Sequence, residues 1–391
     1  MHPRTAILAA RMAPATTKAP AASKQRSSSP LSEVHRARIH ALRKKLKDAQ
    51  CDALVITNEK DIRYFIPFGG EASTLIILPK SLTLISDTRF EEELDPLRRA
   101  MTIVMRSGAM LDALAGALSD LGQQTYALQA DSMTASMRAG LAKRLGAKRL
   151  KDTTGIVASL RRVKDASEVR LIRKAAAIQQ QAMEALIPQL EPGLTEFEVA
   201  AMLEFEMRRR GAEGPSFETI AAARANGSKP HARPGKTKLS PNQPLLIDWG
   251  ARFEGYCSDM TRVFCFGKWP RALKDAYQIT LNAFNAGVAA VKPGARCVEV
   301  DAAARAVIEK SRFPDRFVHS LGHGIGLDVH ELPRLSKQSD ETLMPGDVVT
   351  VEPGIYLPGV GGIRLEDDIL VTPSGRRNLC GLPKDLEWAT L

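Results

Sequence analysis

Short apolar runs alternate with amphipathic stretches along the first 160 residues of the chain. Runs of strand length cover residues 53–57, 74–78, 82–86 and 102–105. Helical periodicity marks residues 31–46, 109–122 and 133–146. Strands that alternate with helices are typical of an α/β domain. We therefore expect a small α/β domain with a mixed sheet over residues 33–160, which follows a tail of residues 1–32.

From about residue 159 onward, a plan of two helices and a hairpin is expected. One long helix is predicted over residues 159–187, and Pro192 with Gly193 ends it. Thr195 can cap a second helix, with Glu198 three residues later, and this helix is expected to end near Gly211. A polar passage rich in glycine and proline then leads to a hairpin over residues 244–266.

The same plan recurs in the last part of the chain. Helices are predicted over residues 271–291 and up to about 311, again separated by a Pro-Gly pair, and a second hairpin spans residues 347–372. Pro192 and Pro293 lie 101 residues apart, and Asp248 and Glu352 lie 104 residues apart. A near-constant offset indicates an internal duplication. We expect an α+β domain over residues 161–391, in which the two hairpins meet at one site.

Carboxylates occupy matching positions in the two hairpins. A turn in which residue 252 pairs with residue 255 places Asp248 opposite Asp259, and a turn centred on Gly359 places Glu352 opposite Glu366. Like charges about 4 Å apart repel by roughly 4 kcal/mol at an effective dielectric constant of 20. Either these carboxylates are solvated on an exposed face, or a divalent metal compensates them.

Three of the seven histidines of the chain, His319, His323 and His330, fall within twelve positions. Glycines at 322, 324 and 326 disfavour a helix, so residues 319 and 323 are expected to share one face of an extended segment. A lone histidine is more often structural than a ligand. Three beside a predicted acidic cluster indicate that at least one binds metal.

The net charge of +11 belongs mainly to the N-terminal part of the chain. Residues 1–48 hold 11 Lys or Arg residues but only Glu33 and Asp48 as acidic ones, so a nucleic-acid partner is not expected. Disorder is the expectation for residues 1–32, with a transit peptide, or a start at Met12, as the alternatives.

Other features narrow the class of protein. No apolar run approaches the length of a membrane span, so no membrane partner is expected. Five scattered cysteines without a CxxC pair favour a reducing compartment, and we expect a cytoplasmic protein. The first domain shows neither a phosphate-binding glycine loop nor a cluster of metal-ligating residues. Its expected role is structural or oligomerising, in a homodimer or a higher homo-oligomer.

With these residues in place, the sequence resembles a known superfamily. Asp248, Asp259, His323, Glu352 in Val-Glu-Pro-Gly and Glu366 in Gly-Ile-Arg-Leu-Glu-Asp resemble, in order and flanking sequence, the five ligands of the pita-bread metallopeptidases. Within it, the chain is most similar to Xaa-Pro aminopeptidases and Xaa-Pro dipeptidases (prolidases). The resemblance is strong over residues 160–385. Residues 35–160 more loosely resemble the creatinase-like N-terminal domain of that family.

The resemblance implies a role for each of the five ligands. Asp259 and Glu366 bridge two divalent metal ions. Asp248 completes the shell of one ion, and His323 and Glu352 complete the shell of the other. An oxygen-rich shell with one imidazole suits manganese, and cobalt or zinc can substitute for it.

The resemblance also implies how the reaction proceeds. A metal-bridging water is the nucleophile, and Glu352 is the general base that passes its proton to the leaving amine. His231, His319 and His330 match further histidines of the family near the substrate. They are expected to polarise the scissile carbonyl, stabilise the oxyanion and line the proline pocket.

Two more residues are expected to act close to the ligands. Arg364 matches an arginine near the active site of the family, with a purely structural salt bridge to Asp367 or Asp368 as the alternative. Thr261 shares the face of Asp259, where its hydroxyl can hold a ligand oxygen.

The resemblance implies an exopeptidase that hydrolyses the Xaa-Pro bond at the N-terminus of short proline-containing peptides, an Xaa-Pro aminopeptidase. An Xaa-Pro dipeptidase remains open, because loop shape decides whether the site caps a free carboxylate. A non-peptidase hydrolase or lyase on the same fold, and a metal-binding scaffold protein without activity, are further alternatives. The predicted N-terminal domain disfavours a methionine aminopeptidase, which usually has a single domain.

Overall fold

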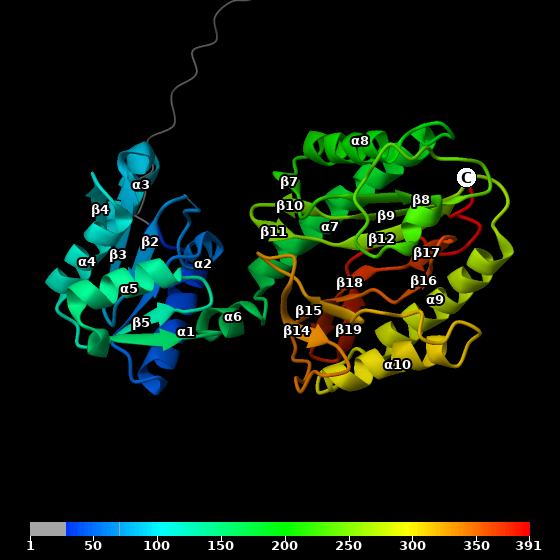
Figure 1. Ribbon diagram of the computed structural model, residues 1–391. Helices are drawn as coiled ribbons and strands as arrows, with labels where there is room; N and C mark the ends of the chain where they lie inside the picture. Colours follow the sequence, from blue (N-terminus) through cyan, green and yellow to red (C-terminus); the bar gives the residue numbers. More distant parts are fainter. Residues whose placement is uncertain (1–28, 70) are drawn as a thin grey trace, which may run out of the picture.

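The computed structural model describes residues 29–69 and 71–391. The disordered tail predicted over residues 1–32 lies mostly outside these residues, so it stays a prediction, as do the expected domain boundaries. The chain forms a smaller and a larger body that lie side by side, and α6 (Ile156–Arg161) runs between them (Figure 1).

The smaller body is built on one six-stranded sheet with the order β4-β3-β2-β1-β5-β6. β2 pairs antiparallel with β1 and β3, whereas the β3–β4, β1–β5 and β5–β6 pairs are parallel. The predicted mixed sheet is therefore confirmed. The strands are β1 (Ala53–Ile56), β2 (Thr74–Ile77), β3 (Leu82–Asp87), β4 (Thr102–Arg106), β5 (Tyr126–Gln129) and β6 (Leu150–Thr153).

Helices cover this sheet, and their caps and spacing explain why they form. The Ser32 side chain accepts a hydrogen bond from the His35 amide and starts the first helix, whose Ile39, Leu42 and Leu46 are buried at helical spacing. The helices are α1 (Glu33–Asp48), α2 (Glu59–Phe65), α3 (Glu91–Leu94), α4 (Met110–Leu121) and α5 (Ala135–Leu145), with 3₁₀ turns at Thr88–Phe90, Asp95–Arg99 and Ala147–Arg149.

The predicted helices and first four strands of this body are confirmed within a few residues. The pattern misses α2, β5 and β6. β5 contains only a short apolar run, and Leu150 is the single apolar residue of β6. β5 lies beside β1, where Tyr126 and Leu128 are buried under α4 and α5, and β6 pairs with β5. A run of this length does not distinguish a strand from a loop.

In the larger body, two pairs of helices enclose antiparallel strands (Figure 1). α7 and α8 lie on one side, and α9 and α10 lie on the other. One core joins α7 and α8 to β8, β9 and β12, and a second core joins α9 and α10 to strands of both hairpins. The expected arrangement of helices over antiparallel hairpins, repeated twice, is confirmed. The helices are α7 (Ala166–Leu186), α8 (Glu196–Arg209), α9 (Arg271–Ala290) and α10 (Cys297–Glu309), with 3₁₀ turns at Ile187–Gln189 and Arg224–Ser228.

The strands of the larger body form four small sheets. Their orders are β11-β10-β7, β12-β9-β8, β14-β13-β15-β18-β19 and β16-β17. The strands of the first half are β7 (Gly214–Pro215), β8 (Ile220–Ala223), β9 (Pro244–Trp249), β10 (Ala251–Phe253), β11 (Tyr256–Cys257) and β12 (Met260–Cys265). Those of the second half are β13 (Gly322–Gly324), β14 (Glu331–Leu335), β15 (Val348–Val351), β16 (Gly354–Leu357), β17 (Gly361–Arg364), β18 (Asp367–Thr372) and β19 (Gly375–Asn378).

The long helix predicted over residues 159–187 is wrong at its start. α6 ends at Arg161, and α7 begins after Asp165, which caps it by accepting bonds from the Ser167 and Glu168 amides. The Glu168 side chain bonds back to the Asp165 amide, so the capping box starts a new helix here. The predicted cap of α8 by Thr195 and Glu198 is confirmed. Among the helices of residues 29–69 and 71–391, none has both the length and the apolar composition of a membrane span.

Candidate active site

A cavity of about 530 Å³ opens where the two hairpins meet β13. It is lined by all nine side chains that the sequence predicts for the site: His231, Asp248, Asp259, His319, His323, His330, Glu352, Arg364 and Glu366. The first and the last of these nine side chains, His231 and Glu366, lie more than 130 residues apart in the sequence. The duplicated fold therefore brings them together.

The first hairpin turns one residue later than predicted. The turn residues are Glu254 and Gly255, with φ of +46° and +81°, and Phe253 pairs with Tyr256. Asp248 therefore faces Thr261, and the predicted opposition of Asp248 and Asp259 is wrong. A turn with two left-handed residues matches the twist of a hairpin, and Gly255 favours it. The shift moves the register by two residues, so the two aspartates still share one face.

The second hairpin keeps the predicted register. Val351 pairs with Asp367 on one side of Glu352, and Gly354 pairs with Arg364 on the other, so the same pairing places Glu352 opposite Glu366. The two hairpins also touch, because the Glu366 amide donates to the Thr261 carbonyl at 3.3 Å.

His323 presents a free ring nitrogen to the carboxylates. Its Nδ1 lies 3.1 Å from the Gly324 carbonyl, which can only accept, so Nδ1 carries the proton. Nε2 lies 3.4 Å from Glu352 Oε1 and 3.8 Å from Asp259 Oδ2. β13 brings His323 this close because its glycines pack tightly: a Cβ on Gly322 would lie 2.0 Å from the Thr350 carbonyl oxygen.

This donor set fits a divalent cation. Ligand atoms of Asp259, His323 and Glu366 all lie within 4.8 Å of one another. Asp248 Oδ1 and Asp259 Oδ1 are buried and have no hydrogen-bond partner among the described residues. Burial first, and the charge of Glu366 second, raise the pKa values of Asp259 and Glu352 well above their usual range. A cation at this place would satisfy the free oxygens and offset the repulsion.

Arg364 connects the carboxylates to His319. Its guanidinium donates to Asp248 Oδ2 and, at 2.9 Å, to the Tyr356 hydroxyl, which lies 2.8 Å from His319 Nε2. The alternative salt bridge from Arg364 to Asp367 or Asp368 is wrong, because Arg364 pairs with Asp248, and Asp367 pairs with Arg262. Burial raises the pKa of Tyr356 to about 12, so the hydroxyl keeps its proton.

Tyr356 was not among the predicted site residues, although the two-residue period of a strand offered a signal. Every second residue of an extended chain lies on the same face, so Tyr356 shares a face with residue 354 and with Glu352. The other expected supporting contact is present: the Thr261 hydroxyl donates to Glu366 Oε2 at 2.6 Å. Arg364 Nε also donates to Thr261 Oγ1 at 2.9 Å, which orients that hydroxyl.

Further residues line the cavity at its wider end. The ring of His330 packs edge-on against that of His323, with 4.3 Å between centroids, and His231 lies on an exposed segment. Residues that the sequence analysis did not single out also line the cavity, among them Phe217, Glu218, Arg233 and Arg334. No local pattern marks them, because exposed arginines and glutamates are common on any surface.

Comparisons with known proteins agree with this geometry. Residues 170–373 match the model of metallopeptidase family M24, and residues 38–163 match the Creatinase/Prolidase N-terminal domain. The Uncharacterized peptidase YqhT of Bacillus subtilis (strain 168) is 35% identical over 335 residues, which are 86% of this chain and 95% of that protein.

Solved structures of similar proteins extend over nearly the whole described chain. The Xaa-Pro dipeptidase from Bacillus anthracis superposes with a TM-score of 0.87 at 36% identity and covers 91% of this chain and 100% of its own. The X-Pro aminopeptidase from Thermotoga maritima MSB8 gives a TM-score of 0.80 at 33% identity, covering 87% and 99%. The chain is therefore a member of metallopeptidase family M24 that carries a Creatinase/Prolidase N-terminal domain.

Proposed function

We propose that the protein is a dinuclear metal-dependent exopeptidase that hydrolyses the Xaa-Pro bond at the N-terminus of short peptides, as an Xaa-Pro aminopeptidase does. The observation that carries the proposal is the convergence of five potential ligands in one cavity, where two buried carboxylate oxygens find no hydrogen-bond partner in the part of the chain that the structure describes. The names of the similar solved structures, an Xaa-Pro dipeptidase and an X-Pro aminopeptidase, support the substrate class.

Asp259 and Glu366 would bind both of two ions, expected to be manganese, with cobalt or zinc as substitutes. Asp248 would bind one of these ions, and His323 and Glu352 would bind the other. Bound ions supply Lewis acidity and lower the pKa of water from about 16 towards about 7.

The protein's own groups carry the proton and orient the substrate. Glu352, whose pKa burial raises, accepts the proton of the attacking water and returns it to the leaving proline nitrogen. His330 and His231 face the cavity and donate to the scissile carbonyl oxygen as it becomes negative. His319 is fixed by Ser320 and Tyr356 and lines the same wall.

Arg334 favours dipeptidase activity as the second candidate function. It lines the cavity, and within residues 29–69 and 71–391 no carboxylate lies within ion-pair distance of its guanidinium. Arg233, the other arginine at this end, lies 3.7 Å from Glu218. A guanidinium without a partner beside the catalytic groups can bind the free carboxylate of a dipeptide in a fork.

A direct assay tests the proposed function. Purified protein with Mn²⁺ is expected to hydrolyse Ala-Pro, Ala-Pro-Ala or both, and to leave Ala-Ala intact. A chelator should abolish hydrolysis, and added Mn²⁺ should restore it, because the proposed reaction needs the metal ions that these five residues bind. Hydrolysis of Ala-Pro alone identifies a dipeptidase, and hydrolysis of the tripeptide identifies an aminopeptidase. If the protein hydrolyses neither peptide in the presence of manganese, cobalt or zinc, the proposed function is wrong.

Arg334→Gln tests carboxylate recognition. We expect the KM for Ala-Pro to rise about 10- to 100-fold, since a hydrogen bond between charged groups contributes about 1.5–3 kcal/mol. The KM for Ala-prolinamide, which lacks the carboxylate, should stay unchanged. Arg233→Gln is the matched control and should change neither value. Equal effects of Arg334→Gln on the acid and the amide would contradict the assignment.

A further inference from the structure

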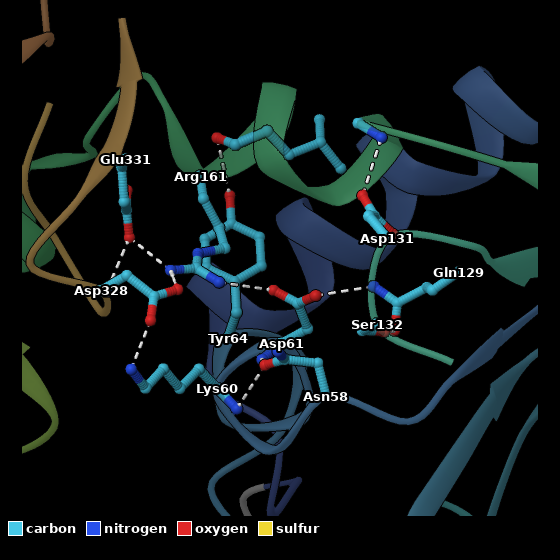
Figure 2. A network of polar contacts seen from close by, with 12 residues as sticks. Asn58, Lys60, Asp61, Tyr64, Gln129, Asp131, Ser132, Arg161, Asp328 and Glu331 are labelled. Carbon is cyan, nitrogen blue, oxygen red and sulfur yellow. Dashed lines mark hydrogen bonds and ion pairs between the residues drawn. The ribbon is translucent and has the colours of Figure 1, made fainter. Parts of the chain in front are cut away.

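Arg161, the last residue of α6, joins the two bodies of the protein through a buried ion network (Figure 2). Its guanidinium donates to Asp61 Oδ1 of α2 at 2.8 Å and to Asp328 Oδ2 at 2.7 Å, and it also contacts Glu331. Its side chain is only 8% exposed. One guanidinium thus binds one carboxylate of the smaller body and two of the larger body.

Other groups complete the network and balance its charge. Lys60 pairs with Asp328, and Lys164 lies 3.0 Å from Glu331 Oε2, so three cations face three anions. The other carboxylate oxygen of Asp61, Oδ2, accepts a hydrogen bond from Gln129 Nε2 at 2.6 Å. Burial would raise the pKa of Glu331, but Lys164 and Arg161 outweigh it and lower the pKa below its usual value. Glu331 is therefore an anion in the folded protein.

Asp328 lies in the loop that carries His330, and Glu331, the first residue of β14, directly follows that histidine. Glu331 Oε1 accepts the Asp328 amide at 3.0 Å, and the Gly326 amide donates to the Asp328 carbonyl at 3.0 Å. A Cβ on Gly326 would lie 2.7 Å from the Glu331 carboxylate, so the loop is packed tightly around this group. His330, between the two anions in sequence, lines the cavity and packs against His323.

We propose that Arg161 is a positioning residue that holds the His330 loop against the cavity, with Asp61 of the smaller body as its anchor. Among residues 29–69 and 71–391, every residue that lines the cavity lies between 217 and 366, so the described part of the smaller body provides none of them. It acts on the site through the network instead. This inference rests on the proposed function for its kinetic test, and it assigns the N-terminal domain a part in that function.

The geometry requires an arginine rather than any cation. A planar guanidinium presents donors in several fixed directions and can bind Asp61, Asp328 and Glu331 at once, whereas an ammonium is a compact point charge. Arg161→Lys should therefore keep the charge balance and lose part of the positioning. Arg161→Gln should lose both.

A double-mutant cycle tests the route through His330. We expect Arg161→Gln to lower kcat/KM for the best Xaa-Pro peptide about tenfold, and Arg161→Lys to lower it less. In a His330→Ala background, Arg161→Gln should have almost no further effect, because the group that it positions is gone. Tyr64→Phe is the matched control: it removes a bond to the Leu160 carbonyl at the same interface without touching the loop, and it should leave kcat/KM unchanged. Full additivity of Arg161→Gln and His330→Ala would overturn the proposal.

Amide hydrogen exchange tests the same inference without any peptide. In Arg161→Gln we expect exchange of the 326–331 amides to rise at least about tenfold, while amides of α8 keep their wild-type rates. Uniformly faster exchange would indicate general destabilisation and would overturn the proposal, as would unchanged exchange in the loop. If the wild type cuts no Xaa-Pro peptide, the proposed function fails, and the exchange result still decides the role of Arg161.

Discussion

Asp259→Asn will lower kcat/KM for Xaa-Pro peptides by at least about 1,000-fold, because Lewis-acid stabilisation of a transition state supplies several kcal/mol and each factor of ten corresponds to about 1.4 kcal/mol. Asp259 is buried, shares the hairpin face with Asp248, and lies next to His323 and Glu366. The amide keeps the shape of the side chain and removes one anionic donor. The measurement is kcat/KM at saturating Mn²⁺, together with metal content after desalting, which should fall below that of the wild type.

Metal should also reverse the order of stability of Asp259→Asn and the wild type. Without metal, Asp259→Asn is expected to be more stable than the wild type, since it removes a buried charge that four other carboxylates repel. With Mn²⁺ the wild type should be the more stable, because a ligand that binds only the folded state stabilises it. Asp120→Asn, on an exposed helix position, is the control and should change neither property. Wild-type metal content and activity in Asp259→Asn would refute the assignment of this residue as a ligand.

Arg262→Met will reduce the free energy of unfolding by about 3–5 kcal/mol, the usual effect of removing one partner of a buried ion pair. Arg262 and Asp367 both have fully buried side chains, 2.7 Å apart. The guanidinium also donates to four carbonyls, those of Thr261, Glu366, Leu382 and Pro383. It therefore ties the strands next to Asp259 and Glu366 to the C-terminal segment, and its loss removes one donor from each of these carbonyls.

Urea unfolding of metal-free protein measures this effect, since bound metal would mask part of it. Arg296→Met is the matched control. Its guanidinium lies 3.6 Å from Glu299, with side chains 61% and 63% exposed, and such pairs contribute about 0–1 kcal/mol. Similar losses in the two variants would show that burial of Arg262 is not what makes it important.

Local patterns predicted much of the fold, because the signals lie within a few residues of each other. Thr195 and Glu198 form the capping box that starts α8, and Pro-Gly pairs end the first helix of each half. The symmetric hairpin around Gly359 led to the right register. In the first hairpin the turn lies one residue later than predicted, because Glu254 and Gly255 adopt left-handed conformations. Asp248 and Asp259 still share one face.

The sequence by itself determined the class of fold and the duplication through alternation and spacing, and its resemblance to the pita-bread metallopeptidases indicated which nine side chains gather at the cavity. Only the tertiary structure decided what the arginines bind. Arg364 reaches Asp248 across 116 positions, Arg161 reaches Asp61 across 100, and Arg262 reaches Asp367 across 105. A guanidinium can pair with any nearby carboxylate, so its partner depends on how the strands and the two bodies pack, and no local pattern carries that information.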